Sequence, residues 1–82
     1  MSAFKTVLYT LKWYTSNSWN TKKAQSAAIN TIGEALSLTN DEGDRSALFT
    51  LRWYFSNRWG HDTITQWETL DLINELIDDT PT

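Results

Sequence analysis

A twelve-residue segment occurs twice in this chain, forty residues apart. LYTLKWYTSNSW (residues 8–19) and LFTLRWYFSNRW (residues 48–59) are identical at eight of twelve positions. Beyond these segments the offset becomes forty-one, as if Gly60 were inserted, and the match continues through most of each half. A period near forty predicts a repeated supersecondary unit, although the tetratricopeptide and ankyrin signatures are absent.

The repeated unit has the pattern of a helical hairpin. At 100° per residue, apolar side chains gather on one face around Leu11 and its copy Leu51, and again around Ile32 and its copy Ile73. We therefore expect helices at about 2–17, 21–38, 42–57 and 62–79. The residues placed to act as N-caps are Ser2, Thr21, Asp62 and one of Asn40, Asp41 and Asp44.

The predicted fold is all-α. Two tandemly duplicated helical hairpins form a small four-helix bundle-like domain with pseudo-twofold symmetry. The halves cover about 2–38 and 42–79, and a linker of about residues 39–44 joins them. A chain of 82 residues buries only about 60–65 % of its unfolded surface, so each half is expected to need the other.

The first helix of each half carries a second aromatic pattern. Trp13 lies about 200° from Leu11 on the helical wheel, and Trp53 repeats this position. Contiguous exposed aromatic residues are uncommon on monomers, so this surface is expected to contact something. The candidate binding residues are Tyr9, Lys12, Trp13, Ser16 and Asn17, with their copies Phe49, Arg52, Trp53, Ser56 and Asn57.

Three contacts could cover these tryptophans. The favoured interpretation packs Trp13 against Trp53 within one chain. A homodimer is the second, because a twofold contact uses the same patch on both sides. A foreign partner or ligand is the third. Lys12 and Arg52 could add cation–π contacts or hold an anion, but solvent-facing roles are favoured for both.

Each hairpin turn is expected to contain a structural cluster. Trp19 and Trp59 are interpreted as plugs of the two turns. Gln25 and Gln66 fall on apolar helix faces one turn further on, and a buried amide needs hydrogen-bond partners. The Ser-Asn pairs of the turns, with Asn17 and Asn57, are the expected partners.

Catalytic and metal-binding patterns are weak in this sequence. His61 is the single histidine and is interpreted as a turn or capping residue, and there is no cysteine. The carboxylates of the last predicted helix are interpreted as a solvated face; they are Glu68, Asp71, Glu75, Asp78 and Asp79. We therefore expect no catalytic site, no metal site and no cofactor.

Charge and hydropathy limit the partners. A formal charge of −3 argues against nucleic-acid binding, and no apolar run is long enough for a membrane span or signal peptide. We expect a cytoplasmic, non-catalytic protein–protein interaction module: an adaptor, inhibitor or regulator that acts through a helix face, with an acidic surface suited to a basic partner. The alternative is a small-ligand binder with an aromatic slot at the two WYxSNxW motifs.

Overall fold

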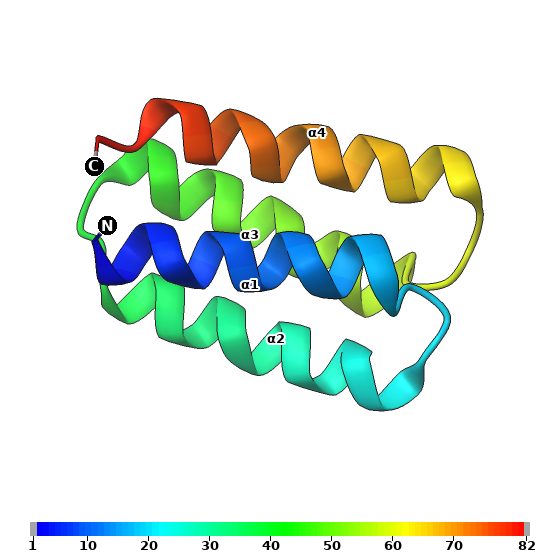
Figure 1. Ribbon diagram of the computed structural model, residues 1–82. Coiled ribbons are helices and arrows are strands. Elements are labelled where there is room, and N and C mark those ends of the chain that lie inside the picture. Colours follow the sequence, from blue (N-terminus) through cyan, green and yellow to red (C-terminus); the bar gives the residue numbers. More distant parts are fainter. Residues whose placement is uncertain (1, 82) are drawn as a thin grey trace.

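The computed structural model describes residues 2–81 and contains four α-helices that run antiparallel in sequence order (Figure 1). They are α1 (Ala3–Asn17), α2 (Lys22–Ser37), α3 (Glu42–Asn57) and α4 (Thr63–Asp79). Each predicted helix is confirmed to within one residue at either end. No strand occurs in this part of the chain, so the all-α prediction is confirmed.

Three of the four helices begin where a side chain accepts from one of their first backbone N–H groups. The Ser2 hydroxyl accepts from the Lys5 N–H at 3.2 Å, and the Asp41 carboxylate accepts from the Asp44 N–H at 2.9 Å. Thr21 occupies the N-cap position of α2, but its side chain makes no capping bond. Because Asp41 caps α3, residues 42–44 of the predicted linker belong to the first turn of that helix.

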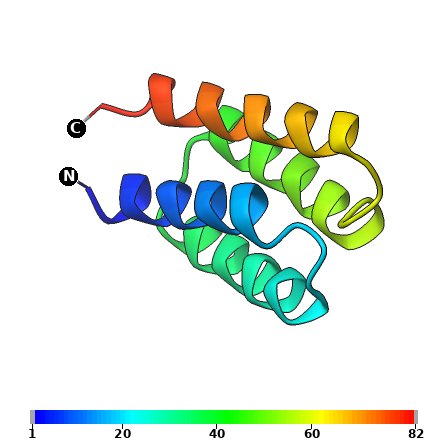
Figure 2. The ribbon, with the colours of Figure 1, turned by 45° about the vertical axis from the view of Figure 1, so that its right-hand side comes forward.

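The four helices form a square in which each contacts two neighbours. α1 and α3 each pack against both α2 and α4, whereas the backbones of the diagonal pairs, α1 with α3 and α2 with α4, do not approach each other (Figure 2). A pseudo-twofold axis along the bundle therefore exchanges the hairpin α1–α2 with the hairpin α3–α4. The outer surfaces of α1 and α3 consequently face away from each other.

Both halves contribute matching side chains to one core. Leu8 and Leu11 are fully buried, and so are their copies Leu48 and Leu51. The second helices of each half supply the opposite wall of this core. The buried core is completed by Phe4, Ala28, Ile32, Ala35, Phe55, Ile73, Leu76 and Ile77.

Gln25 and Gln66 join the halves at the end of the bundle that holds the two hairpin turns. The Gln25 side-chain amide of α2 donates to the Phe55 carbonyl of α3 at 2.7 Å, and Gln66 of α4 donates to the Thr15 carbonyl of α1 at 2.8 Å. Both carbonyls belong to the last helical turn, where intrahelical donors run out. Each second helix thus caps the first helix of the other half.

The partners predicted for these glutamines are wrong. The Asn17 amide donates to the Trp13 carbonyl at 3.0 Å, and Asn57 donates to the Trp53 carbonyl at 2.9 Å. Both asparagines therefore bond within their own helices, on the exposed surface. Asn17 and Asn57 lie two residues after the last buried residue of their helices, so their side chains point to solvent. The carbonyls of Thr15 and Phe55 are instead within reach of the neighbouring helix.

A second exchange ties the opposite end of the bundle. The Arg45 guanidinium of α3 donates to the Leu36 and Thr39 carbonyls at the end of α2, at 2.7 and 3.1 Å. Lys5, the copy of Arg45, donates from Nζ to the Thr80 carbonyl at the end of α4, at 3.2 Å. Cations at helix C-termini also interact favourably with the helix dipole.

Two tryptophans meet between the hairpin turns. The rings of Trp19 and Trp59 lie 4.9 Å apart, and Trp19 is 5 % exposed. The Trp59 indole donates to the Thr21 carbonyl at 3.0 Å, but the buried Trp19 indole N–H has no partner. The turns differ because the second contains Gly60, whose φ is 74°. A side chain at this position would also bring its Cβ to 3.1 Å from the Trp19 carbonyl oxygen, so the turn favours glycine.

Shortening a buried isoleucine tests the assignment of the core. Ile32→Ala and Ile73→Ala are each expected to lower the free energy of unfolding by about 2–4 kcal/mol, because both side chains are fully buried. Ile64→Ala is the matched control on the exposed side of α4 and should change it by less than about 0.5 kcal/mol. Denaturant titration measures all three, and equal effects would contradict the assignment.

Replacing the glutamines tests the exchanged caps. Gln25→Met and Gln66→Met keep the shape of the side chain but lose the donor, so each should cost about 0.5–1.5 kcal/mol in denaturant titration. Asn17→Ala and its copy at Asn57 should cost less, because these amides are exposed. A larger loss for the asparagine variants would assign the caps to the turns instead.

Candidate interaction faces

Two equivalent aromatic surfaces lie on the outside of the bundle. The Trp13 face consists of Tyr9, Lys12, Trp13, Ser16 and Asn17 of α1. The Trp53 face consists of their copies on α3, which are Phe49, Arg52, Trp53, Ser56 and Asn57. Trp13 is 57 % exposed and Trp53 is 51 % exposed. The pseudo-twofold axis places the two faces on opposite corners of the square.

The favoured prediction that Trp13 packs against Trp53 within the chain is therefore wrong. The side chains could meet only if α1 and α3 were neighbours, but these helices are diagonal and turn their leucine faces towards the axis. An up-and-down order of four helices puts the first and third across the diagonal. The same arrangement prevents the two WYxSNxW motifs from lining a single slot.

Both tryptophans are held in the same way. The Trp13 and Tyr14 rings form a T-shaped pair with 5.6 Å between centroids, and Trp53 and Tyr54 form the same pair at 5.5 Å. The two tyrosines are half-buried, and Tyr14 packs against the core. This geometry fixes each tryptophan on the helix surface without covering it.

Cations lie beside the aromatic rings of both faces. Lys12 Nζ lies 6.0 Å from the centre of the Tyr9 ring. Around the other face, the Arg58 guanidinium lies 5.5 Å from the Trp53 ring and Arg45 lies 5.9 Å from the Phe49 ring. These separations are at the outer limit of cation–π contacts. Arg58 was not predicted as part of the face, because its copy in the first half is Ser18 and the repeat therefore does not point to it.

The depressions around the Trp53 face are shallow. The one along α3 has a volume of about 730 Å³, but all of its lining residues come from that single helix, between Glu42 and Tyr54. A small molecule placed there would remain largely open to water, whereas ligand sites usually bury most of the ligand.

Charges of opposite sign are separated between the two halves. Residues 1–40 contain four lysines and one glutamate, for a formal charge of +3, whereas residues 41–82 contain three arginines and nine carboxylates, for −6. α1 carries no acidic residue, and α4 carries no basic one. Within residues 2–81 the one ion pair is His61–Asp62, and no lysine or arginine pairs with a carboxylate.

An acidic groove runs between α3 and α4. It has a volume of about 380 Å³, and its carboxylates are Glu68, Asp71 and Glu75. The half-buried Tyr54 and Leu72 supply apolar surface, and Thr50 completes the lining. The three carboxylates are spread along the groove, and no cluster in residues 2–81 brings together enough His, Asp or Glu side chains to hold a metal ion.

Two apolar residues of α4 are exposed that the sequence analysis did not predict as part of a surface. Ile64 and Trp67 are 69 % and 64 % exposed. They lie three residues apart on the side of the helix away from Ile73, so a helical wheel carries the signal. Comparison of the repeats hides it, because their copies are Lys23 and Ser26.

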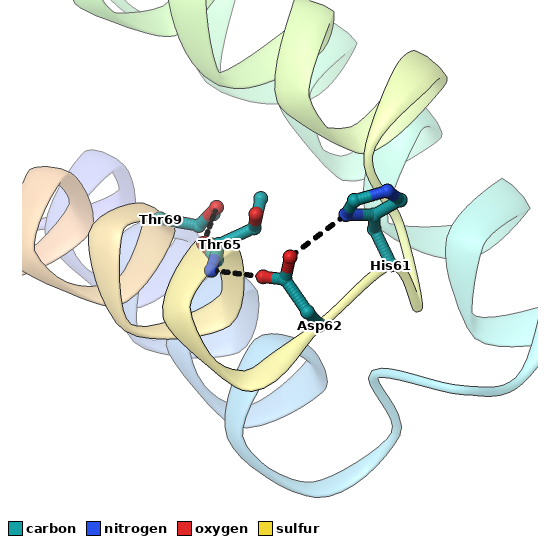
Figure 3. Close-up of polar contacts among 4 residues, drawn as sticks. All are labelled: His61, Asp62, Thr65 and Thr69. Carbon is teal, nitrogen blue, oxygen red and sulfur yellow. Dashed lines mark hydrogen bonds and ion pairs between the residues drawn. The ribbon is translucent and has the colours of Figure 1, made fainter.

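His61 and Asp62 form the N-terminal cap of α4. Figure 3 shows the Asp62 carboxylate between two donors, the Thr65 backbone N–H at 2.6 Å and the His61 ring at 2.9 Å. The Thr69 hydroxyl donates to the Thr65 carbonyl of the same helix at 2.8 Å and does not contact Asp62. The Thr65 N–H holds the pKa of the Asp62 carboxyl below its usual value, and the Thr65 hydroxyl and His61 act in the same direction.

No protein-family model, curated protein or solved structure matches this chain. Among residues 2–81, none of the four helices has both the length and the apolar character that a membrane crossing requires.

Changing the Asp62 cap should alter how stability depends on pH. Its lowered pKa means that the carboxylate stabilises the fold above the ordinary value of 3.8, and that this contribution is lost as pH falls through the lowered pKa. Asp62→Ala should therefore lower Tm by a constant amount at neutral pH, and the difference from the wild type should shrink below pH 3.8.

His61→Ala is the control for this cap. This variant should retain most of the stabilisation that the Asp62 carboxylate provides, because the Thr65 N–H is the principal cause of the lowered pKa. Thermal unfolding followed by circular dichroism measures both variants. A Tm difference for Asp62→Ala that persists unchanged into strong acid would contradict a role for the carboxylate charge.

Proposed function

We propose that this protein is a non-catalytic protein–protein interaction module, a small cytoplasmic adaptor, inhibitor or regulator that binds through the Trp13 and Trp53 faces. The observation that carries the proposal is the exposure of the same aromatic surface in both halves. Trp13 and Trp53 are more than half exposed although the core of the bundle is complete without them.

The composition of these faces favours a protein partner. Tryptophan, tyrosine and arginine are enriched at the energetic centres of protein interfaces, where they combine large apolar area with a polar end. Each face carries a tryptophan and a second aromatic residue, with a cation beside them and small polar residues around them. An exposed tryptophan in such a setting is the kind of residue whose loss weakens binding most.

The placement of the faces favours an adaptor among the three roles. Two similar surfaces on opposite corners of a rigid bundle allow one chain to hold two partner molecules at once. An inhibitor that acts through one face would have no use for the second. Bivalent attachment of this kind also raises the overall strength of binding when both partners belong to one assembly.

A small-ligand binder receives less support. The shallow depression along α3 has a single wall, and the two motifs lie on diagonal helices. The Ser16 and Ser56 hydroxyls remain exposed, but the paired asparagines already donate to their own helices. No enclosed aromatic slot forms from these residues.

Replacing both tryptophans tests the proposal. The Trp13→Ala/Trp53→Ala double variant should keep the Tm of the wild type to within a few degrees, because the indoles contribute little to the core. In quantitative affinity capture from cell extract, proteins retained by the wild type should fall by about tenfold or more, as expected for interface tryptophans.

A matched variant on α2 controls for general surface effects. Ser26→Ala/Asn30→Ala changes two exposed residues on a helix without exposed aromatic side chains and should retain the same proteins as the wild type. Unchanged capture by the tryptophan variant, or its unfolding, would contradict the proposal. In the second case the tryptophans would be structural residues.

A further inference from the structure

We propose that copies of this chain associate head to tail, with the Trp13 face of one copy bound in the acidic groove of the next. This inference rests on the proposed function, because it names a second copy as the partner of the Trp13 face. The two surfaces lie on different sides of the molecule, α1 on one corner and the α3–α4 seam on the other, so they cannot meet within one chain.

The charges of the two surfaces are complementary. Lys12 lies beside the Tyr9 ring on a helix that has no acidic residue. The groove presents Glu68, Asp71 and Glu75 on a helix that has no basic residue. None of these side chains forms an ion pair within residues 2–81. A contact between copies would place Lys12 of one copy near the carboxylates of the next. Such complementarity guides both the encounter and the register of a complex.

The apolar parts of the two surfaces also fit. Tyr9 and Trp13 project from one side of α1 and are 42 % and 57 % exposed. The groove offers the half-buried Tyr54 and Leu72 between its carboxylates. The groove is an open depression with Tyr54 on its α3 side and Leu72 on its α4 side, so an aromatic side chain can lie between the two helices. Ile64 lines the neighbouring depression together with Tyr54 and Glu68 and extends the apolar surface beside the groove.

Other pairings of the same surfaces bring like charges together. A twofold contact of two grooves would place Glu68, Asp71 and Glu75 opposite the same residues of the second copy. A depression between α1 and α2 is lined by one charged residue, Lys23, so the arginine-flanked Trp53 face is repelled from it. Both aromatic faces carry a cation that is complementary to the α3–α4 groove. The Trp13 face is the better match, because α1 has no acidic residue whereas α3 begins with Glu42 and Asp44.

A head-to-tail contact uses different patches on its two sides and therefore does not close at a dimer unless the rotation forms a ring. The contact area is small, with two aromatic residues on one side. We consequently expect weak association that grows with protein concentration and decreases with salt, since its charged part is screened.

Size-exclusion chromatography with light scattering tests this, over about 10 µM to 1 mM protein. At about 10 mM salt the average mass of the wild type should rise with concentration above the 9.5 kDa of one chain, and at about 500 mM salt the rise should be much smaller. A mass that stays at one chain under all conditions overturns the inference, and both faces then remain accessible to a foreign protein.

Charge exchange identifies the two surfaces. Lys12→Glu and Glu75→Lys should each keep the mass near that of a monomer. The double variant Lys12→Glu/Glu75→Lys restores opposite charges across the contact and should associate again. The repeat supplies matched controls at the equivalent positions. Arg52→Glu and Glu34→Lys make the same charge changes outside the proposed contact, so the average mass should depend on protein concentration as in the wild type.

Equal effects of Lys12→Glu and Arg52→Glu, or no recovery in the double variant, would overturn the assignment. This result is separable from the proposed function. A strictly monomeric protein that still loses captured proteins on Trp13→Ala/Trp53→Ala supports a foreign partner and rejects self-association. Concentration-dependent mass with unchanged capture supports self-association alone.

Discussion

The exchange of helix caps between the halves is the constraint on which the rest of this structure depends. Gln25 and Gln66 satisfy the last-turn carbonyls of the other half, and Arg45 and Lys5 do so at the opposite end. A hairpin alone would leave these carbonyls to water and would expose its leucine face. The duplication thus has a structural reason: each copy supplies the groups that its partner lacks.

This exchange also determines which surfaces remain outside. Because each half caps and covers the other through neighbouring helices, α1 and α3 lie across the diagonal, and everything opposite their leucines faces solvent. The symmetry that completes the core therefore displays the aromatic surface twice. The outer sides of α2 and α4 take no part in the core or the caps, and the two copies differ there. Lys23 and Ser26 of α2 correspond to Ile64 and Trp67 of α4. Glu68 and Asp71 of α4 likewise correspond to the neutral Ala27 and Asn30 of α2, so the α3–α4 seam is acidic and the molecule has two unlike surfaces for association.

Helical periodicity predicted the helices and their buried faces, because each helix has one clear apolar stripe and recognisable N-caps such as Ser2 and Asp62. The pairing of helices across the bundle could not be predicted in the same way. A wheel shows that Trp13 lies opposite Leu11, but it does not show whether another helix covers that side. The glutamines were correctly seen to need partners, yet a backbone carbonyl on another element leaves no mark in the sequence. The groove between α3 and α4 likewise depends on which helices are neighbours.

Native-state hydrogen exchange tests most directly the claim that the two halves stabilise each other. Amides of core residues in the first half, such as Leu11 and Ile32, should exchange with the same opening free energy as their copies Leu51 and Ile73, because exchanged caps and a shared core make the bundle one cooperative unit. Gln66→Met should lower the protection of both halves equally. A half whose core amides open at a distinctly lower free energy than those of the other would contradict this account.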